Sequence, residues 1–185
     1  VQLLWVNLVT DSLPAIALGV DPPAKDIMEK KPIAPGRSMF SDGLGIRIAL
    51  EGMMIGALAL LAFIIGIRFF DLPGPLSQSL PELSSASPEI GRTMAFAVLS
   101  LSQLFHAFNM RSAHSLFRIG PFSNKKLCLA FLICAFLQIV VISVPVLAEI
   151  FRVVPLSPVQ WLITFVLSVL PIGIVELQKK LAPSS

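Results

Sequence analysis

The residues best suited to chemistry lie in the first apolar stretch of the chain, VQLLWVNLVTDSLPAIALGV, in which Asp11 is the only ionisable side chain. A carboxylate at bilayer depth is costly unless a cation, a proton or a polar partner meets it. Asn7, Thr10 and Asp11 have the spacing i, i+3 and i+4, which predicts that an α-helix places them on one face. They offer amide, hydroxyl and carboxylate oxygens, so we expect them to bind a hard metal cation.

Pro14 extends this face by one turn and strengthens the prediction of a cation site. Proline has no N–H, so in an α-helix the carbonyl of Thr10 would lose its usual donor. Interrupted helices with oxygen donors at mid-membrane are how transporters hold dehydrated cations. The alternative is that these groups only bond to neighbouring helices, which is common for asparagine and threonine but accounts poorly for Asp11.

A second polar stripe, in GRTMAFAVLSLSQLFHAFNMRS, carries Gln103 and His106. Polar residues often join helices inside a membrane bundle, and we expect that role here. His106 is interpreted as a core or membrane-edge histidine rather than a metal ligand. Arg47 and Glu51 have the i, i+4 spacing of a helical ion pair, which predicts that they pair near the membrane edge.

The elements that must position these side chains are membrane helices. The chain is 55% hydrophobic and 14% charged, with a mean hydropathy of +0.84, whereas soluble domains carry about 25% charged residues. A spanning helix needs about 20 mainly apolar residues, and Pro145 predicts a kink in one of them. We expect an all-α, polytopic transmembrane bundle of five spans: Val1–Val20, Leu44–Phe70, Thr93–Phe117, Leu127–Ile150 and Val159–Leu177.

Basic residues are distributed unevenly among the loops between these spans. Arg68, Arg92 and Arg152 lie on one side of the expected bundle, and the other eleven of the fourteen lysine and arginine residues lie on the opposite side. The positive-inside rule places the richer side in the cytoplasm. We therefore expect the start of the chain to be extracytoplasmic and its C-terminus to be cytoplasmic. The net charge of +3 reflects this bias and does not indicate a nucleic-acid partner.

Motifs for ATP hydrolysis do not occur in the sequence. It has no glycine-rich phosphate loop, no DKTGT-like aspartyl-phosphate motif and no His/Cys metal spacing. The chain alone is therefore not expected to be an enzyme. It opens on Val1, without a signal peptide and almost directly in a functional helix, which predicts a piece of a longer protein.

The segment NLVTDSLPAIALGVDPPAKDIM closely resembles the sixth transmembrane helix of P-type calcium-transporting ATPases, the sarcoplasmic-reticulum and plasma-membrane calcium pumps. Its pattern N-x-x-T-D, L-P-A and P-P-x-x-D-I-M is long and specific. Further along, GRTMAFAVLSLSQLFHAFNMRS resembles the eighth helix, SLFRIGPFSNKKL the following loop, and VPLSPVQWL the entry to the tenth. The resemblance implies that residues 1–185 are the C-terminal transmembrane domain, helices six to ten, of a ten-helix cation pump.

The resemblance also implies roles for individual residues. Asn7 and Asp11 match calcium ligands of the sixth helix, and Thr10 matches a third residue used by two-site pumps. Gln103 stands where two-site pumps place an acidic ligand on the eighth helix, and plasma-membrane-type pumps also lack that acid. This difference implies a lost or weakened second site and one calcium ion per cycle. Ser12 stands where glycine is common, which implies altered local unwinding with the same ligands.

Calcium is the transported ion that this resemblance implies, with ATP and magnesium bound only by cytoplasmic domains outside this sequence. The implied partners are the remaining helices and domains of the same pump, together with membrane lipid, and the implied location is a bacterial plasma membrane. Sodium/potassium and proton pumps have more acidic sixth helices, which favours calcium over their ions. Sodium-exporting and manganese-exporting relatives stay open.

Two other classes of membrane protein also stay open. One is a non-catalytic helical module that acts alone or regulates a partner. The other is part of a secondary transporter, which would carry an inverted repeat; no span of this sequence repeats another convincingly.

Overall fold

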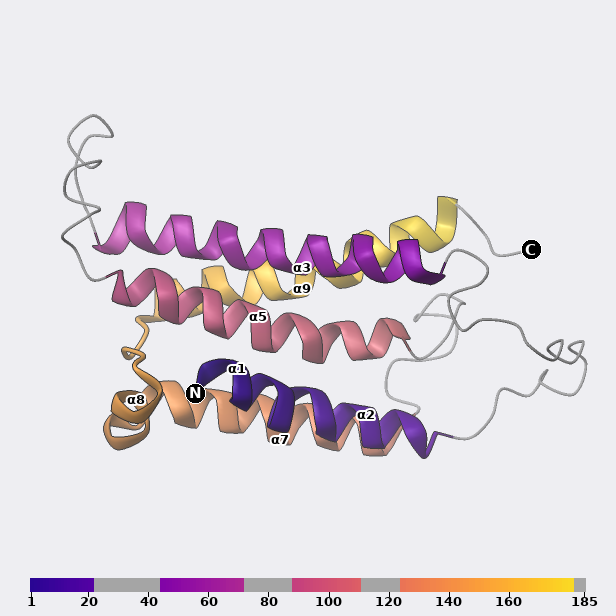
Figure 1. Ribbon diagram of the computed structural model, residues 1–185, viewed down its shortest axis with the longest axis horizontal. Coiled ribbons are helices and arrows are strands. Elements are labelled where there is room, and N and C mark those ends of the chain that lie inside the picture. The colour runs from indigo at the N-terminus through magenta and orange to yellow at the C-terminus, as the bar shows by residue number, and fades with distance from the viewer. Residues whose placement is uncertain (22–43, 72–87, 111–123, 182–185) are drawn as a thin grey trace, which may run out of the picture.

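The computed structural model describes residues 1–21, 44–71, 88–110 and 124–181, and every regular element in these ranges is helical. Figure 1 shows most helices running along one long axis, with α8 turned across it. The all-α prediction is confirmed for this part of the chain. The elements are α1 (Gln2–Trp5), the π-helix η1 (Val6–Asp11), α2 (Ser12–Gly19), α3 (Leu44–Gly66), the π-helix η3 (Ile67–Asp71), α5 (Glu89–Met110), α7 (Lys125–Ser143), α8 (Pro145–Phe151) and α9 (Pro158–Leu181).

The prediction of five membrane spans is confirmed in part. In the described ranges, three helical segments are long and apolar enough to cross a membrane: Leu44–Asp71, Lys125–Ser143 and Pro158–Lys179. The helix α5 is 22 residues long, but polar side chains such as Gln103 and His106 lower its hydropathy. The first segment is short and carries Asn7 and Asp11. Both polar segments nevertheless lie lengthwise beside the apolar helices (Figure 1).

The predicted span Thr93–Phe117 also begins and ends elsewhere. The helix α5 begins at Glu89, one turn earlier, and is described as far as Met110. The remaining residues of that prediction, 111–117, lie outside the described part of the chain.

Pro145 begins a new helix rather than kinking a continuous one. The predicted span Leu127–Ile150 divides into α7 and α8 at Val144, whose backbone is extended with φ −86° and ψ 118°. Proline disfavours the α conformation at the residue before it and suits the first turn of a following helix. These two effects end α7 at Ser143 and allow α8 to leave its direction.

The helix α5 lies at the centre of the bundle and packs most extensively against α3 and α9. On that side, Met94 and Val98 of α5 form an apolar cluster with Leu58, Ala62 and Leu167. A second cluster joins α5 to the first segment and to α7 and α8; its buried members are Val6, Phe96, Ala97, Val141, Ile142, Ala148 and Val153. The central helix α5 therefore packs against the first segment and α7 on one side and against α3 and α9 on the other.

A close crossing of α3 and α5 is made by Gly66 and Gly91. A Cβ atom on Gly66 would overlap the Cα atom of Gly91 and lie 2.7 Å from its nitrogen. Beyond the crossing, the carboxylate of Asp71 accepts hydrogen bonds from the backbone N–H groups of Ile90 at 3.1 Å and Gly91 at 2.9 Å. These donors lie in the first turn of α5, where the helix itself supplies no acceptor. Asp71 thus caps the helix that follows it.

Candidate functional site

The predicted cation-binding residues lie in a π-helix. The first segment continues from α1 through η1 into α2, and η1 contains Asn7, Thr10 and Asp11. The sequence predicted an interruption of the α-helix near Pro14, and the structure has a change of helical register just before that residue. π-Helical turns are rare and frequently mark functional sites, because they widen the helix and redirect its side chains and carbonyl groups.

The three predicted ligands do not share one face. Thr10 is buried, with 1% of its surface exposed, and its hydroxyl donates a 2.8 Å hydrogen bond to the carbonyl of Val6. Asn7 is exposed and Asp11 is half-buried. The expectation of a common face assumed α-helical spacing, which a π-helix does not keep. The side chain of Thr10 is buried and its hydroxyl is bonded within its own segment, whereas Asn7 is exposed.

Ser12 satisfies a backbone group at this register change. Its hydroxyl donates a 3.0 Å hydrogen bond to the carbonyl of Asn7, five residues earlier. A glycine at this position could not make the bond. Serine in place of the glycine that the resemblance led us to expect at position 12 therefore adds a hydrogen bond on the exposed side of the π-helix.

Gln103 lies half-buried on α5. Its Oε1 atom is shielded from solvent and has no hydrogen-bond partner among the described residues. Buried carbonyl oxygens are normally paired, so this atom is a free acceptor for a group that the described residues do not supply. The structure shows no hydrogen bond from Gln103 to η1 within the described ranges, and the link between the two predicted sites remains a prediction.

A buried ionic group joins α3 to α5 near the end of the bundle where α3 begins. Arg47 Nε lies 2.8 Å from Glu51 Oε1, which confirms the predicted i, i+4 pair. The other oxygen of Glu51 lies 3.2 Å from His106 Nε2. Glu51 is 5% exposed, so it is a buried carboxylate with two partners. His106 has the interhelical role expected of it.

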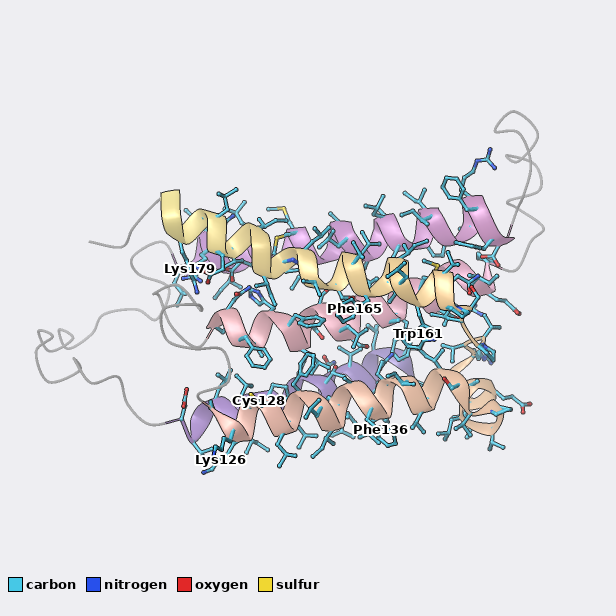
Figure 2. All side chains as sticks on the ribbon, turned by 180° about the vertical axis from the view of Figure 1, so that it is seen from behind. Lys126, Cys128, Phe136, Trp161, Phe165 and Lys179 are labelled. Carbon is cyan, nitrogen blue, oxygen red and sulfur yellow. The ribbon has the colours of Figure 1, made fainter. Side chains whose placement is uncertain are left out.

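The same end of the bundle includes α9. Lys179 Nζ donates a 3.1 Å hydrogen bond to the carbonyl of Asn109 and lies 3.6 Å from Glu176 Oε1. Asn109 in turn donates a 3.3 Å bond to the carbonyl of Pro171. Figure 2 shows Lys179 reaching from α9 toward the neighbouring helices. Polar side chains therefore join α3, α5 and α9 where these helices lie closest to the C-terminus.

We expect Glu51→Ala to lower the free energy of unfolding of the detergent-solubilised protein by about 3 kcal/mol, because it leaves a cavity and removes the shared partner of Arg47 and of the mostly buried His106. The control is Arg47→Gln, which should cost roughly 1 kcal/mol or less. The Arg47 side chain is 42% exposed, a glutamine amide can still donate to Glu51, and His106 stays beside the other oxygen of Glu51. Thermal unfolding of both variants measures the difference. Equal midpoints for the two variants would contradict the assignment of Glu51 as the shared partner.

No three His, Cys, Asp or Glu side chains gather into a metal-binding group within the described ranges. Asp11 is the one carboxylate in the π-helix η1, and Asn7 in the same helix is exposed. The described residues thus offer a partial set of hard oxygen donors on the open side of the first segment.

Comparison with known proteins places this geometry in context. Residues 1–181 match the family described as "Cation transporting ATPase, C-terminus". The chain is 42% identical over 181 residues to "Calcium-transporting ATPase 1" of Bacillus cereus, a match that covers 97% of this chain and 20% of that protein.

Two further relatives show the same pattern of coverage. "Calcium-transporting ATPase" of Bacillus subtilis is 40% identical over 171 residues, covering 92% of this chain and 18% of that protein. "Calcium-transporting ATPase" of Plasmodium falciparum is 32% identical over 197 residues, covering 91% and 16%. The chain thus spans about a fifth of the length of these curated relatives.

Proposed function

This chain belongs to the family of cation-transporting ATPase C-termini, and from that premise we propose that it supplies part of the ion site and the supporting helical bundle of an ATP-driven calcium export pump. The observation that supports the proposal is the π-helix η1, which leaves Asn7 exposed and Asp11 half-buried on one open side of the first segment. Three relatives with 32–42% identity are named as calcium-transporting ATPases.

The proposed site is incomplete within this chain. Calcium takes about 6–8 oxygen ligands, whereas the open side of η1 offers the side chains of Asn7 and Asp11. Thr10 would contribute through its backbone, because its hydroxyl already bonds to Val6. The remaining ligands, the aspartyl-phosphate chemistry and the ATP and magnesium sites would belong to the rest of the longer protein, which is also the principal partner of this chain.

Gln103 limits the proposed stoichiometry to one calcium ion per cycle. Its free Oε1 is a neutral acceptor, and it cannot offset the charge of a second divalent cation. Two neighbouring calcium ions with too few carboxylates would repel strongly at low dielectric. A lost or weakened second site at Gln103 is therefore part of the proposal.

The test is ATP-driven calcium uptake by inside-out vesicles that contain the full-length protein. We expect uptake that requires ATP and magnesium, with one calcium ion bound per phosphorylated protein at saturation. Uptake of manganese or sodium in place of calcium would reassign the ion. The absence of any cation-stimulated ATP hydrolysis would overturn the proposed function, and two bound calcium ions would overturn the role given to Gln103.

We further propose that the chain starts on the extracytoplasmic side of a bacterial plasma membrane and ends in the cytoplasm. The basic bias of the loops supports this orientation. So does the topology, since the ends of α2, α5 and α9 and the starts of α3 and α7 lie at one end of the bundle (Figure 1). Among the described residues, that end carries Arg47, Lys125, Lys126 and Lys179.

We expect a membrane-impermeant maleimide added to intact cells to label a cysteine at Ser84 and not one at Ser123. Both positions lie outside the described residues, and the predicted loops place them on opposite sides of the membrane. The background for this measurement is Cys128→Ala with Cys134→Ser, which removes the native thiols. Labelling of the Ser123 variant alone would reverse the orientation.

A further inference from the structure

The helix α7 contacts the first segment through polar side chains, although it is one of the three apolar helices long enough to cross a membrane within the described ranges. The indigo first segment and the orange α7 run side by side in Figure 1. Gln138 Oε1 accepts a 3.0 Å hydrogen bond from Trp5 Nε1. Cys134 Sγ donates to the carbonyl of Val9 at 3.4 Å. These two contacts are one helical turn apart on each partner.

A third contact holds the far end of the first segment. Asn124, the residue that caps α7, accepts a 2.9 Å bond from the N–H of Leu127 and donates a 3.3 Å bond to the carbonyl of Ala17. One amide side chain thus starts α7 and ties it to α2. Together the three bonds to Trp5, Val9 and Ala17 fix the register of the two segments over most of their shared length.

The three α7 side chains that make these contacts are buried, so water cannot replace their partners in the first segment. Gln138 and Cys134 are 0% exposed and Asn124 is 6% exposed. A buried polar group without a hydrogen bond is costly, by about 1–3 kcal/mol. The first segment therefore loses several paired groups at once if it rotates or slides against α7. This penalty selects one orientation of the π-helix.

The Val9 carbonyl is the contact within the π-helix itself. Hydrogen bonds of a π-helix run from residue i+5 to residue i, and the residue five beyond Val9 is Pro14, which has no N–H. The thiol of Cys134 donates to this carbonyl instead. The bond lies between Asn7 and Asp11 in the chain, so it acts on the turn that carries both candidate ligands.

On the premise of the proposed cation site, we propose that Asn124, Cys134 and Gln138 are positioning residues that fix the orientation of the π-helix. They bond to the side of the first segment that faces α7. Asn7 and Asp11 are thereby presented on the open side, where the ion and the rest of the pump would meet them. None of the three is a ligand; each acts through the backbone or side chain of the first segment.

The test uses the full-length pump carrying Cys134→Ala or Gln138→Leu. We expect the calcium concentration for half-maximal ATPase activity to rise roughly tenfold, as for groups that orient metal ligands, while the maximal rate stays within about twofold of the parent. Cys134→Ser should restore the parent value, because a hydroxyl can donate to the same carbonyl. A change in maximal rate alone would overturn the positioning role.

The control is Phe136→Leu, on the same helix between the two tested positions. Phe136 is 64% exposed and points away from the bundle in Figure 2. Its half-maximal calcium concentration should match that of the parent. An effect equal to that of Cys134→Ala would show that any change in α7 disturbs the site, and would overturn the specific contacts.

Hydrogen–deuterium exchange of the same variants separates this inference from the proposed function. Peptides that cover Val6–Leu13 should exchange faster in Cys134→Ala and Gln138→Leu, and at the parent rate in Cys134→Ser. If the variants show this exchange pattern but the pump transports another cation, calcium is not the transported ion and the positioning role is still supported. Unchanged exchange together with an unchanged half-maximal calcium concentration would refute the positioning role and leave the calcium pump intact.

Discussion

Asp11→Asn in the full-length pump is expected to lower the apparent calcium affinity by about a hundredfold or more, which corresponds to roughly 3 kcal/mol. Asp11 is the one carboxylate of the π-helix η1 and lies half-buried on its open side. The substitution keeps the size and most of the hydrogen-bonding capacity of the side chain, but removes the charge that offsets a dehydrated divalent cation at low dielectric. Calcium-dependent phosphorylation by ATP measures the loss.

The matched control is Asp21→Asn, which makes the same chemical change beyond the end of α2. We expect its calcium dependence to stay close to that of the parent pump. Asn7→Ala should be intermediate, because it removes a neutral oxygen donor from the exposed part of the same turn. Parent-like calcium affinity in Asp11→Asn would remove Asp11 from the site and with it the main support for the proposed function.

Gly66→Ala and Gly91→Ala are expected to destabilise the bundle by about 3 kcal/mol each, at the upper end of the cost of overpacking. An added Cβ on Gly91 would lie 2.8 Å from the carbonyl oxygen of Phe63 and 2.8 Å from Cγ1 of Ile67. The neighbour of Gly66 is backbone, which cannot move without separating α3 from α5. Alanine is otherwise the better helix former by about 1 kcal/mol. A loss of stability in these variants would therefore support the close crossing of α3 and α5, and a gain would contradict it.

Gly173→Ala is the control for this pair, because nothing lies within 4 Å of a Cβ placed there. It should leave stability unchanged or raise it slightly. Thermal unfolding of the purified protein in detergent measures all three variants. Stabilisation by Gly66→Ala would refute the close crossing. Gly52 and Gly56 also have open space around them in the described structure, and we expect them to meet a helix from the rest of the pump.

Local chemistry explains what could be predicted from the sequence. The membrane class follows from composition, and the i, i+4 pair of Arg47 and Glu51 follows from helical geometry. Pro145 predicted a kink in the fourth predicted span, whereas the structure has two separate helices there. Of the five predicted spans, three are helices long and apolar enough to cross a membrane within the described ranges, whereas α5 is more polar and the first segment is short.

The candidate site was only partly predictable. Asp11 was identifiable because a lone carboxylate in an apolar stretch has a high solvation cost wherever the helix packs. The grouping of Thr10 with Asn7 assumed an α-helix, whereas the chain forms a π-helix in which Thr10 is buried and Asn7 is exposed. The register of a helix with a proline in it depends on which groups outside the segment satisfy its carbonyls, and the segment alone does not contain that information.

By itself, then, the sequence determined the helical membrane class, the place of Asp11 in an apolar segment and the break before Pro145. These properties depend on composition and on residues within one or two turns. Tertiary structure alone decided the contact of Glu51 with His106, 55 residues away, and the contact of Cys134 with Val9, 125 residues away. Such contacts arise because buried polar groups must find partners across a packed interface, and only the packing determines which partners are within reach.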